Sequence, residues 1–322
     1  MRYLEELLKV PAPSGAEGAR RELIEKLAAP FADEVMTDPL GNLIVHKKGA
    51  GEKVMLCAHM DTIGMIATRV ENGFVRFAAL GGLDVRDLQN IPVVFENGVE
   101  GVLSYEGKTP AKERRLHHCF IDIGDGKVCV GDRASFSGGL RNLGTNLISA
   151  PYLDNTLGCA ILLEVLSELK ECEYDVYFVF TVQEEVGLRG AKTAAFGIAP
   201  KFAIAVDVTD SGDLPETDVV METKLGAGAA IKIMDQSVVC HPKLVGALKA
   251  CAEKNGIPYQ SEVLVAGGTD AGAIHLSGSG VITGGVSIPT RYIHSPCETA
   301  DKRDCDAAVN LIRSALEQAI LI

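Results

Sequence analysis

Short runs of consecutive apolar residues recur along the chain and predict strands buried inside a sheet, because such strands are covered on both faces. The clearest of these runs cover residues 53–58, 174–180, 201–206 and 281–288. Segments with helical periodicity lie between and around them, at 3–9, 158–169, about 188–196, 242–255 and about 301–320. Ser14 and Glu17 have the spacing of a capping box, which predicts a further helix running to about Leu27. The alternation of strands and helices predicts an α/β fold with a mixed sheet between helical layers.

Residues 67–148 depart from this pattern. They contain short apolar stretches separated by Gly and Asn, with little helical periodicity. This pattern predicts a small all-β unit, a barrel or a sandwich, inserted into the larger domain. The larger domain would therefore be discontinuous and consist of residues 1–66 and 149–322.

Composition narrows the range of partners. The 322 residues include 43 Asp and Glu against 31 Lys and Arg, which argues against nucleic acid or an anionic membrane surface as the main partner. The start of the chain has no apolar signal-peptide core, and no apolar run is long enough to span a bilayer. The nine scattered cysteines form no Cys-x-x-Cys pair, so we expect reduced thiols in a cytoplasmic protein.

Two adjacent acids follow the 174–180 strand, at Glu184 and Glu185. Open α/β sheets bind their ligands at the carboxyl ends of strands, where one carboxylate can hold a metal ion and its neighbour can move a proton. The pair also fits a simpler interpretation, as solvated acids in the first turn of the next helix.

A second polar pair ends the 53–58 strand. His59 and Asp61 are two residues apart, so in an extended segment their side chains point the same way. An imidazole can then bind a metal through one nitrogen while the carboxylate orients the ring through the other. A lone histidine at a strand end is also often structural.

Three further candidates complete the set. Asp207 ends the 201–206 strand, His294 follows the last strand, and Asp154 precedes the apolar helix, where it could equally be an N-cap. Two imidazoles and three carboxylates, with one glutamate left over, are a plausible ligand set for two divalent metals that share a carboxylate. Cysteine is absent from these positions, which favours a catalytic site over a closed structural one.

The chain also resembles the tetrahedral (TET) and glutamyl aminopeptidase family of dinuclear metallopeptidases, of which some members carry an endoglucanase label. The resemblance covers nearly the whole chain in the order of the family's motifs. The matching segments are His59–Gly64, Leu153–Asn155, Gln183–Ala191, Val206–Thr209, Gly267–Gly272 and Arg291–Pro296.

The resemblance implies a fold and a ligand set. The fold would be an α/β/α metallopeptidase domain with an inserted barrel-like domain that serves oligomerisation or substrate access. One metal would be held by His59, Asp154 and Asp207, and the other by Asp154, Glu185 and His294, so that Asp154 bridges them. The metals would be two ions of zinc or cobalt per chain. The assembly would be a homo-oligomer, typically a tetrahedral dodecamer.

The same resemblance implies that Glu184 is the general base that accepts a proton from the attacking water, and that Asp61 orients His59. The substrates would be peptides with a free N-terminus. Thr62 and Thr156 stand where many relatives have Glu and Arg, so a salt bridge beside the metals could be lost. Thr269, Asp270 and Arg291 lie in the matching segments without a definite role.

The leading hypothesis is thus a metal-dependent aminopeptidase. A glycan hydrolase is one alternative, although Glu184 and Glu185 are too close in the chain to straddle a glycosidic bond. A non-catalytic peptide-binding homologue is another, motivated by the threonines at 62 and 156.

Overall fold

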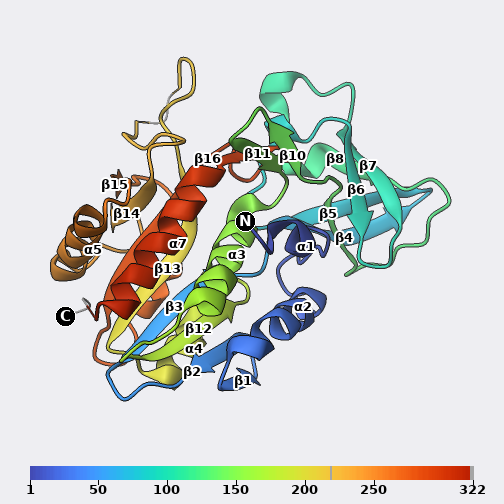
Figure 1. The fold of residues 1–322 in the computed structure, drawn as a ribbon. Helices are drawn as coiled ribbons and strands as arrows, with labels where there is room; N and C mark the ends of the chain where they lie inside the picture. Colours follow the sequence, from blue (N-terminus) through green and yellow to red (C-terminus); the bar gives the residue numbers. More distant parts are fainter. Residues whose placement is uncertain (218–219, 320–322) are drawn as a thin grey trace.

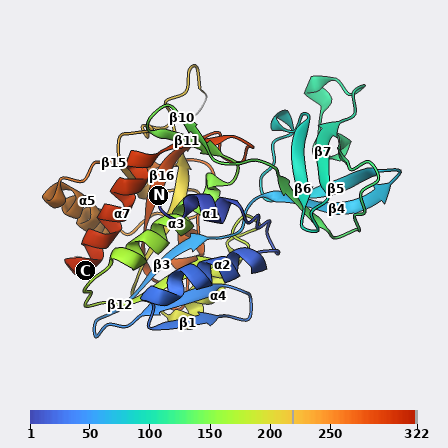
Figure 2. The same ribbon diagram turned by 45° about the vertical axis from the view of Figure 1, so that its right-hand side comes forward.

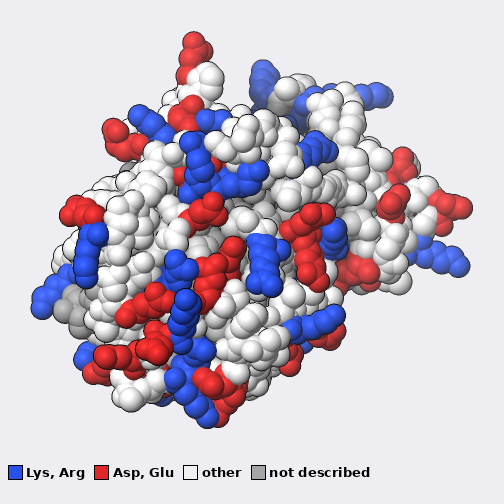
Figure 3. Space-filling model, in the orientation of Figure 1, with Lys and Arg blue, Asp and Glu red and all other residues white. Residues whose placement is uncertain are grey.

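The computed structural model describes residues 1–217 and 220–319. They form a large α/β body and a β-barrel that stands to one side of it (Figures 1 and 2). In the face drawn in Figure 3, acidic and basic side chains are interspersed across the surface. None of the helices within the described ranges is both long and apolar enough to cross a bilayer.

The large body is built on an eleven-stranded mixed sheet. Its main path runs β1 (Glu34–Thr37), β2 (Leu43–Lys47), β12 (Asp175–Thr181), β3 (Lys53–His59), β13 (Phe202–Asp210), β16 (Ile282–Arg291), β17 (Glu298–Asp301), β11 (Leu147–Ala150) and β10 (Arg141–Leu143). β14 (Ala229–Met234) pairs with β16 and carries β15 (Tyr259–Val263). The four central strands β12, β3, β13 and β16 are mutually parallel and correspond to the four predicted apolar runs.

Helices cover both faces of this sheet (Figure 1). Alternate residues of β3 belong to different cores, since Val54 and Leu56 pack on one side and Met55 and Cys57 on the other. The first core includes side chains of α1 (Leu4–Leu8), α2 (Gly18–Ala28), α3 (Leu153–Glu168), α5 (Pro242–Asn255) and α7 (Lys302–Glu317). The second includes α4 (Arg189–Ile198) and α6 (Ala271–Ile274). The predicted α/β/α architecture is confirmed.

The inserted unit is a closed barrel with strand order β4-β5-β8-β7-β6-β9. Its strands are β4 (Gly64–Glu71), β5 (Phe74–Leu80), β6 (Ile91–Phe95), β7 (Glu100–Tyr105), β8 (Cys119–Asp122) and β9 (Arg133–Phe136). It has a hydrophobic core of its own, which includes Val75, Leu103 and Ile121. The barrel strands thus span 64–136, while β10 and β11 pair with the large sheet. A division into separate domains at residues 67 and 148 stays a prediction.

Two local predictions differ from the structure. Ser14 and Glu17 do not form a capping box, because α2 begins at Gly18 without a side-chain hydrogen bond from its N-cap residue Glu17. Ser14 instead donates a hydrogen bond to Asp61, just after β3, and Glu17 accepts one from the backbone of Gln183, in the turn after β12. The C-terminal helix ends at Glu317, and residue 320, where its end was predicted, lies outside the described residues.

Candidate metal centre

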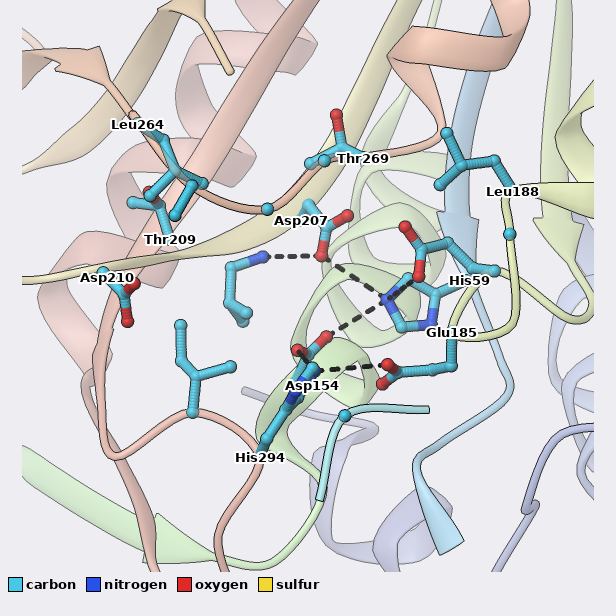
Figure 4. A pocket seen from close by; sticks show the side chains of 18 residues that line it. His59, Asp154, Glu185, Leu188, Asp207, Thr209, Asp210, Leu264, Thr269 and His294 are labelled. Atoms are coloured by element: carbon cyan, nitrogen blue, oxygen red, sulfur yellow. Dashed lines mark hydrogen bonds and ion pairs between the residues drawn. The ribbon is translucent and has the colours of Figure 1, made fainter. Parts of the chain in front are cut away.

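The carboxyl ends of the central parallel strands meet at one edge of the sheet and bring the candidate side chains together. His59 ends β3, and Asp207 lies near the end of β13. Glu184 and Glu185 follow β12, His294 follows β16, and Asp154 lies at the start of α3. All six line one cavity of about 500 Å³ (Figure 4).

Asp154 lies between the two imidazoles. Its Oδ1 is 3.1 Å from His59 Nε2, and its Oδ2 is 3.3 Å from His294 Nε2. Asp154 is free to face the cavity because Asn155 performs the capping role. Asn155 Oδ1 accepts a hydrogen bond from the Gly158 N–H at 2.9 Å, and Asn155 Nδ2 donates to the carbonyl of Val206 at 2.8 Å.

Each imidazole also faces other carboxylates. His59 Nε2 is 3.5 Å from Asp207 Oδ1 and 4.0 Å from Glu184 Oε2. His294 Nε2 is 3.2 Å from Glu185 Oε2. Five of the six residues are buried or nearly so, since only His294 keeps a third of its side chain exposed, at 35%.

Burial and mutual charge shift the pKa values around His59. Burial raises the pKa of Glu184 well above its usual range; nearby His59 opposes this shift and Asp207 adds to it. Burial disfavours the charged form of His59, but the carboxylates of Glu184 and Asp207 outweigh that effect and raise its pKa well above the usual value.

His294 shows the same balance on the other side of Asp154. Burial disfavours its charged form, but Glu185 and Asp154 outweigh burial and raise the pKa of His294 to about 12. Without metal, the surrounding carboxylates therefore favour the protonated form of both imidazoles. A divalent cation would compete with those protons, because a histidine must be deprotonated to bind a metal.

The donor set fits divalent metal ions. Glu185 Oε1 is buried without a hydrogen-bond donor among the described residues. A buried carboxylate oxygen without a donor is unfavourable unless a cation compensates it. Imidazole and carboxylate ligands without thiolate suit zinc and related ions at catalytic sites.

Two groups of side chains have ligand atoms within 4.8 Å of one another. They are His59 with Glu184 and Asp207, and His59 with Asp154 and Glu185. The predicted sets divide the same side chains differently, since they place His294 beside Asp154 and Glu185 and exclude Glu184. The distances alone are therefore compatible with Glu184 as a metal ligand and with Glu184 as a general base.

Asp61 contacts this centre differently from the expectation. The His59 ring nitrogen Nδ1 is 3.0 Å from the backbone carbonyl oxygen of Asp61 and 3.7 Å from its carboxylate. The carboxylate instead accepts hydrogen bonds from the backbone N–H groups of Glu184, at 2.9 Å, and Glu185, at 3.2 Å, and from the Ser14 hydroxyl, at 2.7 Å. Asp61 therefore orients the His59 ring through its backbone and the glutamate turn through its side chain.

Two more residues support the centre, although the sequence did not indicate either of them as part of a site. Glu298 is buried in β17 and accepts hydrogen bonds from the backbone N–H groups of Asp154 and His294, both at 2.8 Å. Glu17 accepts from the N–H groups of Gly15, at 2.8 Å, and Gln183, at 3.2 Å. Glu298 lies only four residues after His294 in the sequence, which could have suggested that the two side chains are close. Its contact with Asp154 could not be predicted in this way, because it depends on the order of the strands in the sheet.

The surroundings of Thr156 and Thr62 differ from each other, and neither was evident from the sequence. Arg20 of α2 is fully buried, and its Nη1 donates to Thr156 Oγ1 at 3.2 Å and to the carbonyl of Met60 at 3.1 Å. A guanidinium group therefore lies beside Thr156 even though residue 156 is not an arginine. The side chain of Thr62 is buried, and its hydroxyl has no hydrogen-bond partner among the described residues.

Three residues without a predicted role belong to the surroundings of the cavity. Thr269 Oγ1 donates to Asp235 Oδ2 at 3.0 Å, and Thr181 Oγ1 donates to Asp270 Oδ2 at 2.5 Å. Arg291 forms a two-bond salt bridge with Asp213, at 2.8 and 2.7 Å. These contacts hold the loops that line the cavity.

Comparison with known proteins gives consistent matches over nearly the whole chain. A family model described as M42 glutamyl aminopeptidase matches residues 41–311. A protein of Acetivibrio thermocellus, named as a proposed aminopeptidase, is 47% identical over 97% of both chains.

Solved structures show the same fold. An aminopeptidase from the archaeon Desulfurococcus kamchatkensis matches with a TM-score of 0.94 at 38% identity, over 98% of this chain and 94% of that one. A TET peptidase from Pyrococcus horikoshii, described as assembling into a tetrahedron or a large octahedral shell, matches with a TM-score of 0.87 at 34% identity over 98% of both chains.

Proposed function

The chain belongs to the M42 glutamyl aminopeptidase family, and from this premise we propose that it removes N-terminal residues from peptides with the help of two divalent metal ions. The observation that carries the proposal is the position of Asp154, whose two carboxylate oxygens face different imidazoles. A bridging carboxylate between two sets of ligands is the arrangement that a two-metal hydrolase needs.

In the proposed centre, Asp154 would be shared between the two metals. His59 and Asp207 would hold the first metal, and Glu185 and His294 would hold the second. Zinc or cobalt fits this mixture of nitrogen and oxygen donors. When bound, such ions supply Lewis-acid chemistry that acidifies a water molecule and polarises the peptide carbonyl.

Glu184 is assigned the proton transfers. Its carboxylate is buried, lines the cavity and lies 4.0 Å from His59 Nε2. It accepts the proton of the attacking water and then donates it to the amine of the departing peptide. Burial raises the pKa of Glu184, so its carboxylate binds a proton more readily than an exposed glutamate does.

Asp61 and Glu298 serve this reaction by position. Asp61 fixes the backbone that carries Glu184 and Glu185, and Glu298 fixes the backbone of Asp154 and His294. By fixing the backbone, both residues keep the attached side chains in the geometry that the reaction requires. The acidic lining attracts the positively charged N-terminus of a peptide, which favours cleavage at that end.

The test is the substitution Glu184→Gln, which keeps the shape and removes the base. We expect hydrolysis of aminoacyl chromogenic substrates to fall by about 100- to 10,000-fold, while metal analysis still finds two ions per chain. Chelation should abolish wild-type activity, and added zinc or cobalt should restore it. Wild-type turnover in the variant would reject Glu184 as the base, and loss of metal would identify it as a ligand.

We also propose that the chain forms a homo-oligomer, for which the TET assemblies of the Pyrococcus horikoshii relative are the precedent. A tetrahedral dodecamer is the specific expectation, and sedimentation of a stable monomer would reject it. All nine cysteines are free thiols, in keeping with a reducing cytoplasmic location, which the same proposal includes.

A further inference from the structure

We propose that Asp210 makes this enzyme selective for peptides whose first residue is basic, by binding the cationic end of a lysine or arginine side chain. The inference rests on the proposed aminopeptidase function and adds to it the chemical class of the first residue. It is carried by the position of Asp210 in the cavity, by the neighbours of its carboxylate and by the apolar surface beside it.

Asp210 lies in the same cavity as the metal centre but outside the ligand cluster. It is the last residue of β13, three positions beyond Asp207, and it is half-buried. In Figure 4 it lies across the cavity from Leu188, beyond Asp154 and Asp207, with its carboxylate beside the open space. A side chain extending from a residue held at the metal centre therefore has room to reach it.

The Asp210 carboxylate has no ion-pair partner among the described residues. The neighbouring arginine, Arg291, is already engaged by both carboxylate oxygens of Asp213. The hydroxyl of Thr223 donates to the backbone carbonyl of Asp210 at 2.7 Å and leaves its carboxylate free. His294 acts on this carboxylate electrostatically but forms no ion pair with it. A partly desolvated carboxylate without a directly bonded cation is a site that an incoming ammonium or guanidinium group can satisfy.

The wall near Asp210 is apolar. Leu264 and Ile293 line the same cavity, and Leu264 is nearly fully buried. Lysine and arginine bury their methylene stems along apolar surface while the charged end reaches a polar group. An apolar wall that ends in a carboxylate matches both parts of such a side chain.

The backbone around Asp210 is held in place, as a selective site requires. Residues 202–210 pair in parallel with β16, and the register places Asp210 beside Thr290. The following loop is tied back by the Asp213–Arg291 salt bridge and by the hydrogen bond from the Gly212 N–H to the carbonyl of Thr223, at 2.9 Å. The carboxylate is therefore supported close to the cavity rather than carried on a free loop.

The assignment separates basic from acidic substrates. A glutamate side chain in this position would meet the like charge of Asp210 in a partly desolvated site, so it should be disfavoured. This expectation is opposite to the substrate that appears in the family's description, which makes glutamyl substrates a sharp part of the test.

The experiment compares p-nitroanilides of lysine, norleucine and glutamate on the metal-loaded, full-length enzyme. Norleucine has the four-carbon stem of lysine without the amine. We expect the wild type to favour lysine over norleucine by about 10- to 100-fold in kcat/KM, the range of one charge-assisted contact. Asp210→Asn should remove most of that preference and leave the norleucine value within about twofold, while Asp210→Glu should retain a preference for lysine.

Glu222→Gln is the matched control, because Glu222 is an exposed acid in the segment that follows β13 and its substitution changes net charge equally. It should leave the preference unchanged. A wild type that favours norleucine or glutamate, or an Asp210→Asn variant that loses all substrates equally, would overturn the inference and leave the aminopeptidase proposal standing. Failure to cleave any aminoacyl substrate would reject the proposed function, and this inference with it.

Discussion

Asp61 Oδ1 accepts a hydrogen bond of 2.9 Å from the backbone N–H of Glu184. Because Asp61 Oδ2 also accepts from the Glu185 N–H, a single carboxylate fixes the turn that carries the proposed base and a proposed ligand. The turn is demanding, since Gln183 has a positive φ of 55° and must be stabilised by its neighbours. The carboxylate of Asp61 supplies that stabilisation from the end of a different strand.

The first prediction follows from this contact. Asp61→Asn keeps one acceptor oxygen but turns an amide N–H₂ toward a donor, so one of the two glutamates should lose its support. We expect kcat to fall by about 10- to 100-fold, as is typical when a residue that orients metal ligands is replaced, while far-UV circular dichroism stays unchanged. Ser14→Ala, which removes only the hydroxyl donor to Asp61, should have a smaller effect. An Asp61→Asn enzyme with wild-type kcat would show that the turn holds its geometry without the carboxylate.

A second prediction concerns pH. Hydrogen bonds from Arg291 lower the pKa of Asp213 from 3.8 to about 2, although burial opposes the shift. A carboxyl group whose pKa is lower in the folded state stabilises the fold above its unfolded pKa, and this contribution disappears as pH falls through the folded pKa. Because the pair is partly exposed and screened by solvent, wild type should exceed Asp213→Asn in free energy of unfolding by only about 1 kcal/mol at neutral pH, and the gap should narrow as pH falls below about 4.

Urea unfolding at a series of pH values measures this gap, with Glu222→Gln as an exposed-acid control in the segment that follows β13. A difference between wild type and Asp213→Asn that stays constant from neutral to acid pH would mean that packing, and not the ion pair, accounts for the effect.

The third prediction concerns Arg20, which joins α2 to the end of β3 and to α3. Its guanidinium donates to three acceptors, the carbonyls of Val10 and Met60 and the hydroxyl of Thr156. Arg20→Ala would leave these buried acceptors unpaired and open a cavity, so we expect a loss of about 3 kcal/mol or more in the free energy of unfolding.

Lys26→Ala, at an exposed position of the same helix, should change stability by less than about 0.5 kcal/mol. Arg20→Met separates the two causes, because it retains most of the stem volume and removes the donors. If Arg20→Met were as stable as the wild type, the hydrogen bonds would contribute little and packing alone would account for the residue.

The sequence predicted the central strands because each is a continuous apolar run, and it placed His59 and Asp207 at one edge because parallel strands end together. It could not place Glu298 beside Asp154, since that contact needs β17 to lie antiparallel to β16 in the middle of the sheet. Ser14 and Glu17 were misread as a capping box for a related reason. Their spacing fits a local motif, but the end of β3 and the turn after β12 offer them stronger partners.

The barrel was predicted as an all-β insertion, but a barrel and a sandwich share the same pattern of short strands, and only the pairing of β4 with β9 closes the ring. The hydrogen-bond partner of Thr156 also could not be predicted from the sequence alone. The buried guanidinium beside it comes from residue 20, 136 positions away along the chain.

The loop that leaves β5 connects the barrel to the metal centre at two glycines. A Cβ on Gly81 would lie 3.1 Å from Glu185 Oε2, and a Cβ on Gly82 would lie 2.7 Å from His294 Nδ1. These positions tolerate hardly any side chain, and any shift of the barrel toward the sheet would press backbone atoms against two proposed ligands. The bare backbone of these two glycines therefore lets the segment that leaves the barrel lie directly against both proposed ligands, and an added methyl group at either position would crowd Glu185 or His294.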